Sequence, residues 1–200
     1  MCITVFSGTN GSSINELNNP RGLALNSISG ALYIADSDNH RVMSYLSNVP
    51  TLVAGGNGSG TSNTQLNFPN GLAFDSSSNS LYIVNYASHN VVRWVLGESS
   101  WTLVAGSPAG TAGVLSTMLY YPIGLTLDAM GNIYVADYNN HRIQLFMRGK
   151  LNGTTIAGVT STAGNHAYLL YYPYGVALDS DFNLFVVDRS NQRIQKFLRY

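Results

Sequence analysis

The apolar residues of this chain fall in short runs separated by turn-forming residues, and no segment shows the sustained 3.6-residue period of an amphipathic helix. The runs at 123–128, 133–137, 141–146 and 154–158 are rich in β-branched and aromatic residues and are bounded by Gly, Asn and Asp. We interpret them as four consecutive β-strands. Several runs, such as 133–136, are apolar at consecutive rather than alternate positions, which indicates strands that are covered on both faces.

The same order of runs occurs four times along the 200 residues. Each copy opens on Pro-x-Gly followed by an aliphatic residue, and the copies are 49, 53 and 51 residues apart, beginning at Pro20, Pro69, Pro122 and Pro173. A period of about 50 residues made of short strands is typical of a β-propeller, in which each repeat forms one blade. The sequence therefore predicts an all-β chain with four four-stranded blades. We expect a single domain over residues 1–200, with repeats at about 17–55, 66–106, 119–158 and 170–200.

The ends of the chain complement each other in this pattern. The last repeat stops after its third strand, at Tyr200, whereas residues 2–8 match the pattern of a fourth strand. We therefore expect the N-terminal strand to complete the last blade, because such closure removes an open edge that could otherwise pair with other chains.

Two turns carry the most specific motif, Asp-Ser-Asp-Asn-His-Arg-Val at 36–42 and Asp-Tyr-Asn-Asn-His-Arg-Ile at 137–143. Together with the Pro-x-Gly opening, an aromatic residue that ends the third strand and an Ala-Gly end to the fourth, these motifs closely resemble the NHL repeat over essentially the whole chain. Three positions depart from the pattern, namely Asn85, Asn90 and Gln192 in place of Asp, Arg and His. The resemblance implies a β-propeller of NHL type. Propellers similar to this family usually have six blades, so an open arc of a larger, six-bladed propeller is the alternative, and an incomplete ring could self-associate.

Charge and composition favour some partners over others. Ten basic and ten acidic residues give no net charge, and the basic residues are scattered, so nucleic-acid binding is not expected. No apolar run reaches 18 residues, so no membrane insertion is expected. Three Asn-Gly-Ser/Thr sequons, at Asn10, Asn57 and Asn152, favour an extracellular protein over a cytosolic one.

The candidate catalytic and metal-binding residues have structural interpretations. His40, His89 and His141 occupy one repeat position, and we expect each imidazole to bond a turn carbonyl rather than a metal. Six of the ten acidic residues end strands, where carboxylates cap turns. We therefore assign no catalytic residue, no metal ligand and no cofactor, while a calcium or zinc ion in the central channel stays open as an alternative.

An aspartate that ends the second strand is followed five residues later by an arginine in three repeats, as Asp36 and Arg41, Asp137 and Arg142, and Asp188 and Arg193. The second repeat lacks both residues. Their joint loss predicts that each aspartate pairs with its arginine, since bidentate Arg–carboxylate contacts are favourable.

The loops that enter the first strands are long and differ between repeats, which is where a rigid scaffold binds partners. Tyr is common at interfaces, and the predicted contact residues are the loop tyrosines and the variable residues of Pro-x-Gly, namely Tyr120, Tyr121, Tyr171, Tyr172, Arg21, Asn70, Ile123 and Tyr174. We interpret the chain as a non-enzymatic scaffold for a protein or peptide. Enzymes with similar propellers include amidating lyases and gluconolactonase-like hydrolases, so a metal-dependent lyase or hydrolase with its site at the central channel is the alternative.

Overall fold

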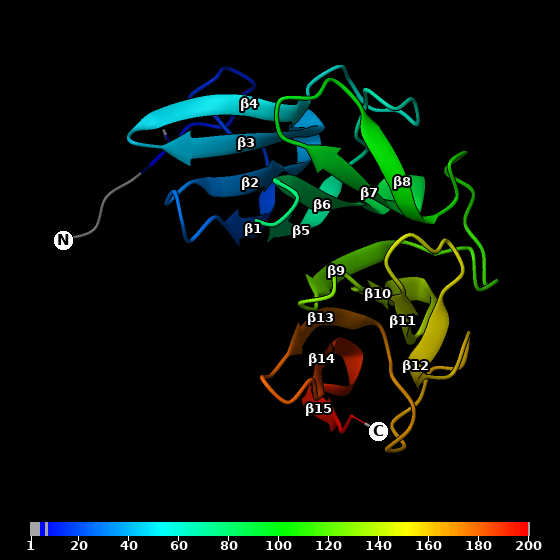
Figure 1. Ribbon diagram of the computed structural model, residues 1–200. Helices are drawn as coiled ribbons and strands as arrows, with labels where there is room; N and C mark the ends of the chain where they lie inside the picture. Colours follow the sequence, from blue (N-terminus) through cyan, green and yellow to red (C-terminus); the bar gives the residue numbers. More distant parts are fainter. Residues whose placement is uncertain (1–4, 7, 200) are drawn as a thin grey trace. The chain divides into compact units, whose positions relative to one another are not determined.

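The computed structural model describes residues 5–6 and 8–199 (Figure 1). Its four sheets confirm the predicted all-β chain of propeller blades. The first blade contains β1 (Pro20–Leu25), β2 (Leu32–Asp36), β3 (Arg41–Leu46) and β4 (Val49–Gly55). The second contains β5 (Pro69–Asp75), β6 (Ser80–Asn85), β7 (Asn90–Val95) and β8 (Trp101–Gly106). The third contains β9 (Pro122–Leu127), β10 (Ile133–Asp137), β11 (Arg142–Phe146) and β12 (Thr154–Gly158), and the fourth β13 (Pro173–Leu178), β14 (Leu184–Asp188) and β15 (Arg193–Phe197).

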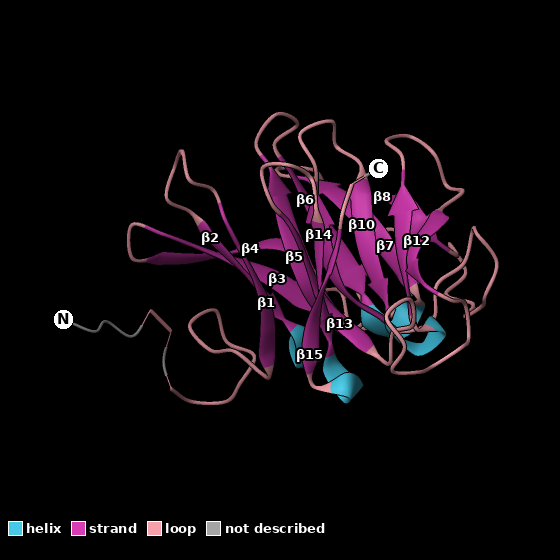
Figure 2. Cartoon of the chain, turned by 90° about the horizontal axis from the view of Figure 1, so that it is seen from below, coloured by secondary structure: helices cyan, strands magenta, loops and turns pink. Residues whose placement is uncertain are grey.

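Each blade is a sheet whose strands follow one another in sequence order. A single 3-10 turn joins the second strand to the third in every blade, as η1 (Ser37–Asn39), η2 (Tyr86–Ser88), η3 (Tyr138–Asn140) and η4 (Arg189–Asn191). Figure 2 shows these turns in cyan at the ends of the magenta strands. In the third blade, Asp137 faces Arg142 across the β10–β11 pair, and Arg142 faces Gly158 across β11–β12. The turn therefore places the motif's aspartate and arginine side by side.

The Pro-x-Gly opening is explained by the close approach of neighbouring first strands. A side chain at Gly22 would collide with the backbone carbonyl of Asn70, and a side chain at Gly124 would collide with that of Tyr174. The pairing of the first strand with the second shifts register at this point in β1, β5 and β13. Glycine is therefore required because only a residue without Cβ lets the two backbones lie this close.

The chain forms two compact units, Met1–Ala87 with Val92–Thr102, and Ser88–Val91 with Leu103–Tyr200. The first unit is built around a core that includes Val42, Leu66 and Leu81, and the second around a core that includes Ile143, Leu170 and Val186. Leu66 and Leu170 come from the strand-entry loops and are fully buried, so each loop is anchored into a blade by an apolar side chain.

The expected closure by residues 2–8 is not seen in the part of this segment that the structure describes. Residues 1–4 and 7 lie outside the described residues, and Val5, Phe6 and Gly8 form bends rather than a strand. Phe6 packs against Ile34 and Met43 of the first blade, with its ring 5.7 Å from that of Tyr45. Within the described residues the last sheet has three strands. The buried Phe6 ring attaches this described part of the segment to the first blade.

We expect Gly124→Ala to lower the free energy of unfolding by about 1–3 kcal/mol, as for other substitutions that overpack a close contact. The added methyl group would force β9 away from the Tyr174 carbonyl. Gly8→Ala is the control, because a Cβ at Gly8 meets no atom within 4 Å. Urea denaturation measures both variants, and equal stabilities would contradict the steric explanation.

Candidate interaction surface

The aspartate at the end of each second strand lies against the arginine that begins the third. Arg41 Nε donates to Asp36 Oδ2 at 2.6 Å, Arg142 Nε to Asp137 Oδ2 at 2.8 Å, and Arg193 Nε to Asp188 Oδ2 at 2.7 Å. All three carboxylates are fully buried. Each carboxylate also accepts one hydrogen bond from a side-chain amide of the 3-10 turn and one from a backbone N–H of the entry loop. In the first blade these donors are the Asn39 side chain and the Asn18 backbone. The structure thus brings together each aspartate and arginine that the sequence analysis paired.

The remaining nitrogens of each arginine bind the entry loop of the same blade. Arg142 Nη1 donates to the carbonyl of Val114 at 2.9 Å, and its Nη2 donates to those of Leu115 and Met118 at 3.1 Å. The other two arginines bond the carbonyls at the same three loop positions. Arg41 donates to Ser12, Ser13 and Glu16, and Arg193 donates to Asn165, His166 and Leu169. A single guanidinium therefore joins a buried carboxylate to a loop of variable sequence, a contact that the sequence analysis did not foresee.

In the second blade a tryptophan replaces part of this arginine network. The indole Nε1 of Trp101 donates to the carbonyl of Gln65 at 2.8 Å. Gln65 directly precedes the anchoring Leu66, so its carbonyl occupies the loop position that Arg41 bonds at Glu16. Asn85 and Asn90 stand in place of the pair, and Asn85 Nδ2 and Asn90 Oδ1 are buried without a hydrogen-bond partner in the described part of the chain.

The motif histidines bind the loop of the next repeat. His40 Nδ1 accepts the backbone N–H of Phe68 at 3.2 Å, and His89 and His141 accept those of Tyr121 and Tyr172 at 3.1 and 3.2 Å. The expected bond to a turn carbonyl is therefore wrong in detail, because the imidazole is an acceptor of a backbone N–H. Burial lowers the pKa of all three histidines, which favours the neutral ring that this hydrogen bond requires.

The residue that each histidine holds lies directly before the proline of the next first strand. Phe68, Tyr121 and Tyr172 have φ values of 50°, 49° and 53°, in the left-handed region that is uncommon for bulky residues. Each ring packs edge-on against the histidine, with centroids 4.4 to 4.6 Å apart. The histidine thereby fixes both the strained backbone and the direction of the aromatic ring.

A cluster of aromatic side chains results at the loops of the third and fourth blades. We call Tyr138, Tyr171, Tyr172, Tyr174 and Arg189 the tyrosine cluster. Tyr171 stacks on Tyr172 at 4.9 Å, and Tyr138 lies 4.7 Å from Tyr172. Arg189 Nη1 donates to the Tyr138 hydroxyl at 2.8 Å, and its guanidinium lies 5.7 Å from the centre of the Tyr174 ring. Tyr171 and Tyr174 remain 38% and 36% exposed.

The other predicted contact residues divide into exposed and buried ones. Tyr120 stacks on Tyr121 with ring centroids 5.2 Å apart and is 37% exposed, and Arg21 is also exposed. Asn70 and Ile123 are only 7% and 6% exposed. Their prediction as contact residues is therefore corrected, because the close packing of the first strands covers the side chains at these two Pro-x-Gly positions.

No three His, Cys, Asp or Glu side chains converge to form a potential metal site within residues 5–6 and 8–199. Over the same residues, no helix is both long enough and apolar enough to cross a membrane.

The blades match a known repeat family. The model described as "NHL repeat" matches residues 17–43, 119–146 and 170–197. The chain therefore carries NHL repeats in three of its four blades. The unmatched repeat is the second one, in which Asn85 and Asn90 replace the ion pair. Comparison with the sequences of curated proteins finds no match.

Several solved structures share the propeller fold of this NHL-repeat protein. An auxiliary nutrient binding protein from Bacteroides thetaiotaomicron is 21% identical with a TM-score of 0.71, over 92% of this chain and 48% of that chain. A gluconolactonase from Xanthomonas campestris is 16% identical with a TM-score of 0.69, and the match covers 90% of this chain and 58% of that chain. A chain of the nidogen/laminin complex is 18% identical with a TM-score of 0.63, and the match covers 96% of this chain and 69% of that chain. The likeness at these identities is one of fold, and the NHL-repeat chain spans about half the length of the nutrient binding protein.

We expect Arg142→Ala to lower the free energy of unfolding by about 3–5 kcal/mol, since it leaves the buried Asp137 carboxylate unpaired. Arg193→Ala should cost less, because the Arg193 side chain is 30% exposed and that of Arg142 only 3%. Arg148→Ala, which breaks no ion pair among the described residues, is the control. If Arg148→Ala proves as costly as Arg142→Ala in chemical denaturation, the ion pair does not hold the blade together.

Trp101→Phe should destabilise the protein by about 1–3 kcal/mol, because the Gln65 carbonyl loses its indole donor while the ring contact is largely kept. Amide hydrogen exchange should also quicken in the entry loop 57–68. Unchanged exchange there would show that the indole does not anchor this loop.

We expect the free energy of unfolding to fall as the pH drops below about 6.5, the ordinary histidine pKa. The pKa values of the three motif histidines are lowered in the folded protein, so the unfolded chain binds more protons and is favoured in acid. His141→Gln, which introduces the residue found at Gln192, should reduce the slope of stability against pH. A slope identical to that of the unsubstituted protein would exclude His141 as a contributor.

Proposed function

We propose that this NHL-repeat protein is a non-enzymatic interaction module that binds a protein or peptide partner through the tyrosine cluster on its loop face. The observation that carries the proposal is the exposure of Tyr171 and Tyr174 on a rigidly held surface. Large exposed aromatic side chains are the residue type that most often supplies the anchors of protein interfaces. Tyr171 is held by stacking on Tyr172 and by an edge contact with His141, and the Arg189 guanidinium lies over the Tyr174 ring, so little ordering remains to be done on binding.

The charge of the tyrosine cluster supports a partner that presents a carboxylate. Arg189 is exposed and forms no ion pair with a carboxylate among the described residues. Its guanidinium is held by the Tyr138 hydroxyl and lies near the Tyr174 ring, which leaves Nη2 and Nε to pair with an anion. An acidic residue beside an aromatic or aliphatic one would satisfy both parts of the surface.

Selection of peptides from a displayed random library on the immobilised protein tests this proposal. We expect Tyr174→Ala and Tyr171→Ala each to lower the affinity for the selected peptides at least tenfold, since loss of a hot-spot anchor costs about 2 kcal/mol or more of binding free energy. Arg189→Gln should weaken acidic peptides more than neutral ones. Met130→Ala, at an exposed turn residue outside the tyrosine cluster, should leave binding unchanged. If only Met130→Ala disturbs the selected peptides, the surface is wrongly placed.

An enzyme of the lyase or hydrolase class is the second candidate, and the fold shared with a gluconolactonase is the observation that favours it. Such an enzyme would bind a metal ion at its site. Metal analysis of the purified protein separates the two proposals. Stoichiometric calcium or zinc, removed by a chelator together with a lactonase or lyase activity, would overturn the scaffold proposal.

A further inference from the structure

A cavity of about 770 Å³ lies at the edge of the third and fourth blades, within one compact unit. Its lining is largely apolar, with Leu145 and Ile156 contributed by the third blade and Leu184 and Phe197 by the fourth. This volume falls within the range of about 300–1,000 Å³ that is usual for small-molecule sites. The tyrosine cluster contributes no residue to the lining.

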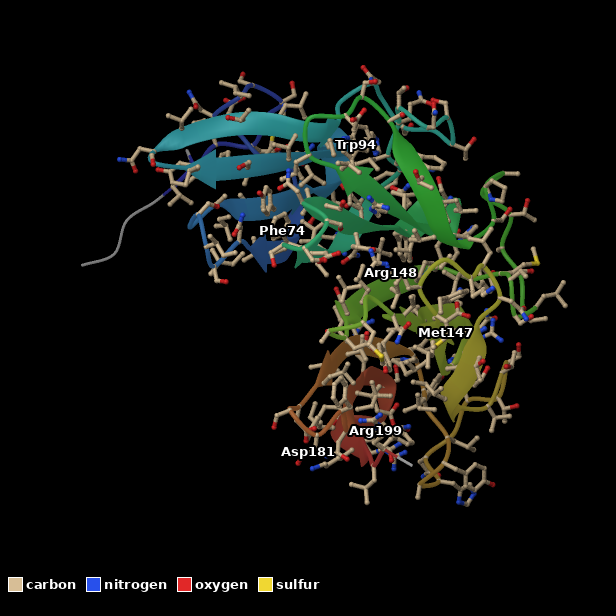
Figure 3. All side chains as sticks on the ribbon, in the orientation of Figure 1. Phe74, Trp94, Met147, Arg148, Asp181 and Arg199 are labelled. Carbon is tan, nitrogen blue, oxygen red and sulfur yellow. The ribbon has the colours of Figure 1, made fainter. Side chains whose placement is uncertain are left out.

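The charged residues that line this cavity are both cationic, Lys196 and Arg199. Lys196 Nζ lies 3.4 Å from Asp179 Oδ2, so its charge is largely balanced. Arg199 forms no ion pair within the described residues, and its guanidinium lies over the Phe182 ring at 4.8 Å. Figure 3 shows Arg199 beside the fourth blade. One uncompensated positive charge is thus held on an aromatic ring that also lines the cavity.

The other compact unit contains a groove at the equivalent position of the repeat, with the opposite charge. Its volume is about 480 Å³, and Tyr33 and Val53 take the places of Tyr134 and Ile156. Glu98 is the only charged residue in its lining. The cationic character of the larger cavity therefore does not follow from the blade architecture alone, because a second copy of the same architecture lacks it.

We propose that the larger cavity binds a small amphipathic monocarboxylate, with its apolar body against Leu145, Leu184 and Phe197 and its carboxylate paired with Arg199. A neutral ligand would leave the guanidinium without a counterion, and a cationic ligand would be repelled by it. Lys196 is already engaged by Asp179. The inference is independent of the partner proposed for the tyrosine cluster.

Isothermal titration of the whole chain with decanoate, decan-1-ol and decyltrimethylammonium tests the proposal. We expect decanoate to bind with one site per chain and more tightly than either other probe. Arg199→Gln should weaken decanoate about tenfold, the effect of losing one charge-assisted contact, and should leave decan-1-ol unchanged. Arg148→Gln is the matched control, since Arg148 packs on the turn at Gly131 and does not line the cavity.

A second variant tests the apolar part without disturbing the core. Leu198 lines the cavity but is 65% exposed, so Leu198→Asp should fold normally and repel the carboxylate. Leu52→Asp, at an exposed residue that lines the smaller groove, should leave decanoate binding intact. Tyr174→Ala should also leave it intact, which separates this site from the tyrosine cluster. The proposal is overturned if decanoate does not bind, if the three probes bind equally, or if Leu52→Asp weakens decanoate as much as Leu198→Asp.

Discussion

In three of the four blades, the buried ion pair between the aspartate that ends the second strand and the arginine that begins the third is the contact on which the rest of the blade depends. Desolvation makes a lone buried carboxylate costly, and burial accordingly raises the pKa of Asp137 while Asn140, Arg142 and the backbone of Tyr120 act in the opposite direction. The carboxylate is therefore tolerated only while its donors stay in place. Because Arg142 also bonds three loop carbonyls, the same constraint fixes the entry loop.

The loop, once fixed, determines what the surface presents. The histidine after the 3-10 turn of the first, second and third blades holds the residue before the next proline in a left-handed conformation, and that residue is a tyrosine at positions 121 and 172. The tyrosine cluster is therefore an outcome of contacts that each blade makes with the loop leading into the following one. Sequence variation in the loops can change the surface while the ion pair and the histidine keep its geometry.

The strands, the blade order and the pairing of Asp137 with Arg142 follow from the sequence because they depend on local periodicity repeated four times. Contacts that depend on a particular blade do not follow from it. Trp101 bonds Gln65 in the one blade that lacks the arginine, and no local pattern predicts that contact. Asn70 and Ile123 are buried by the approach of neighbouring first strands, and Phe6 is placed by the core of the first blade rather than by its strand-like sequence. The cavity near Arg199 likewise arises from residues of two blades, which a pattern within one repeat does not specify.

Amide hydrogen exchange in Arg193→Gln tests most directly whether the ion pair holds the loop that carries the tyrosines. In the folded protein, Gly164 N–H donates to Leu170 and Leu169 N–H to His166 within this loop, and these amides should be protected. We predict that the substitution removes protection across 159–172 while the loop at 107–121, held by Arg142, exchanges as before. Unchanged protection at Gly164 and Leu169 in a folded variant would contradict the account.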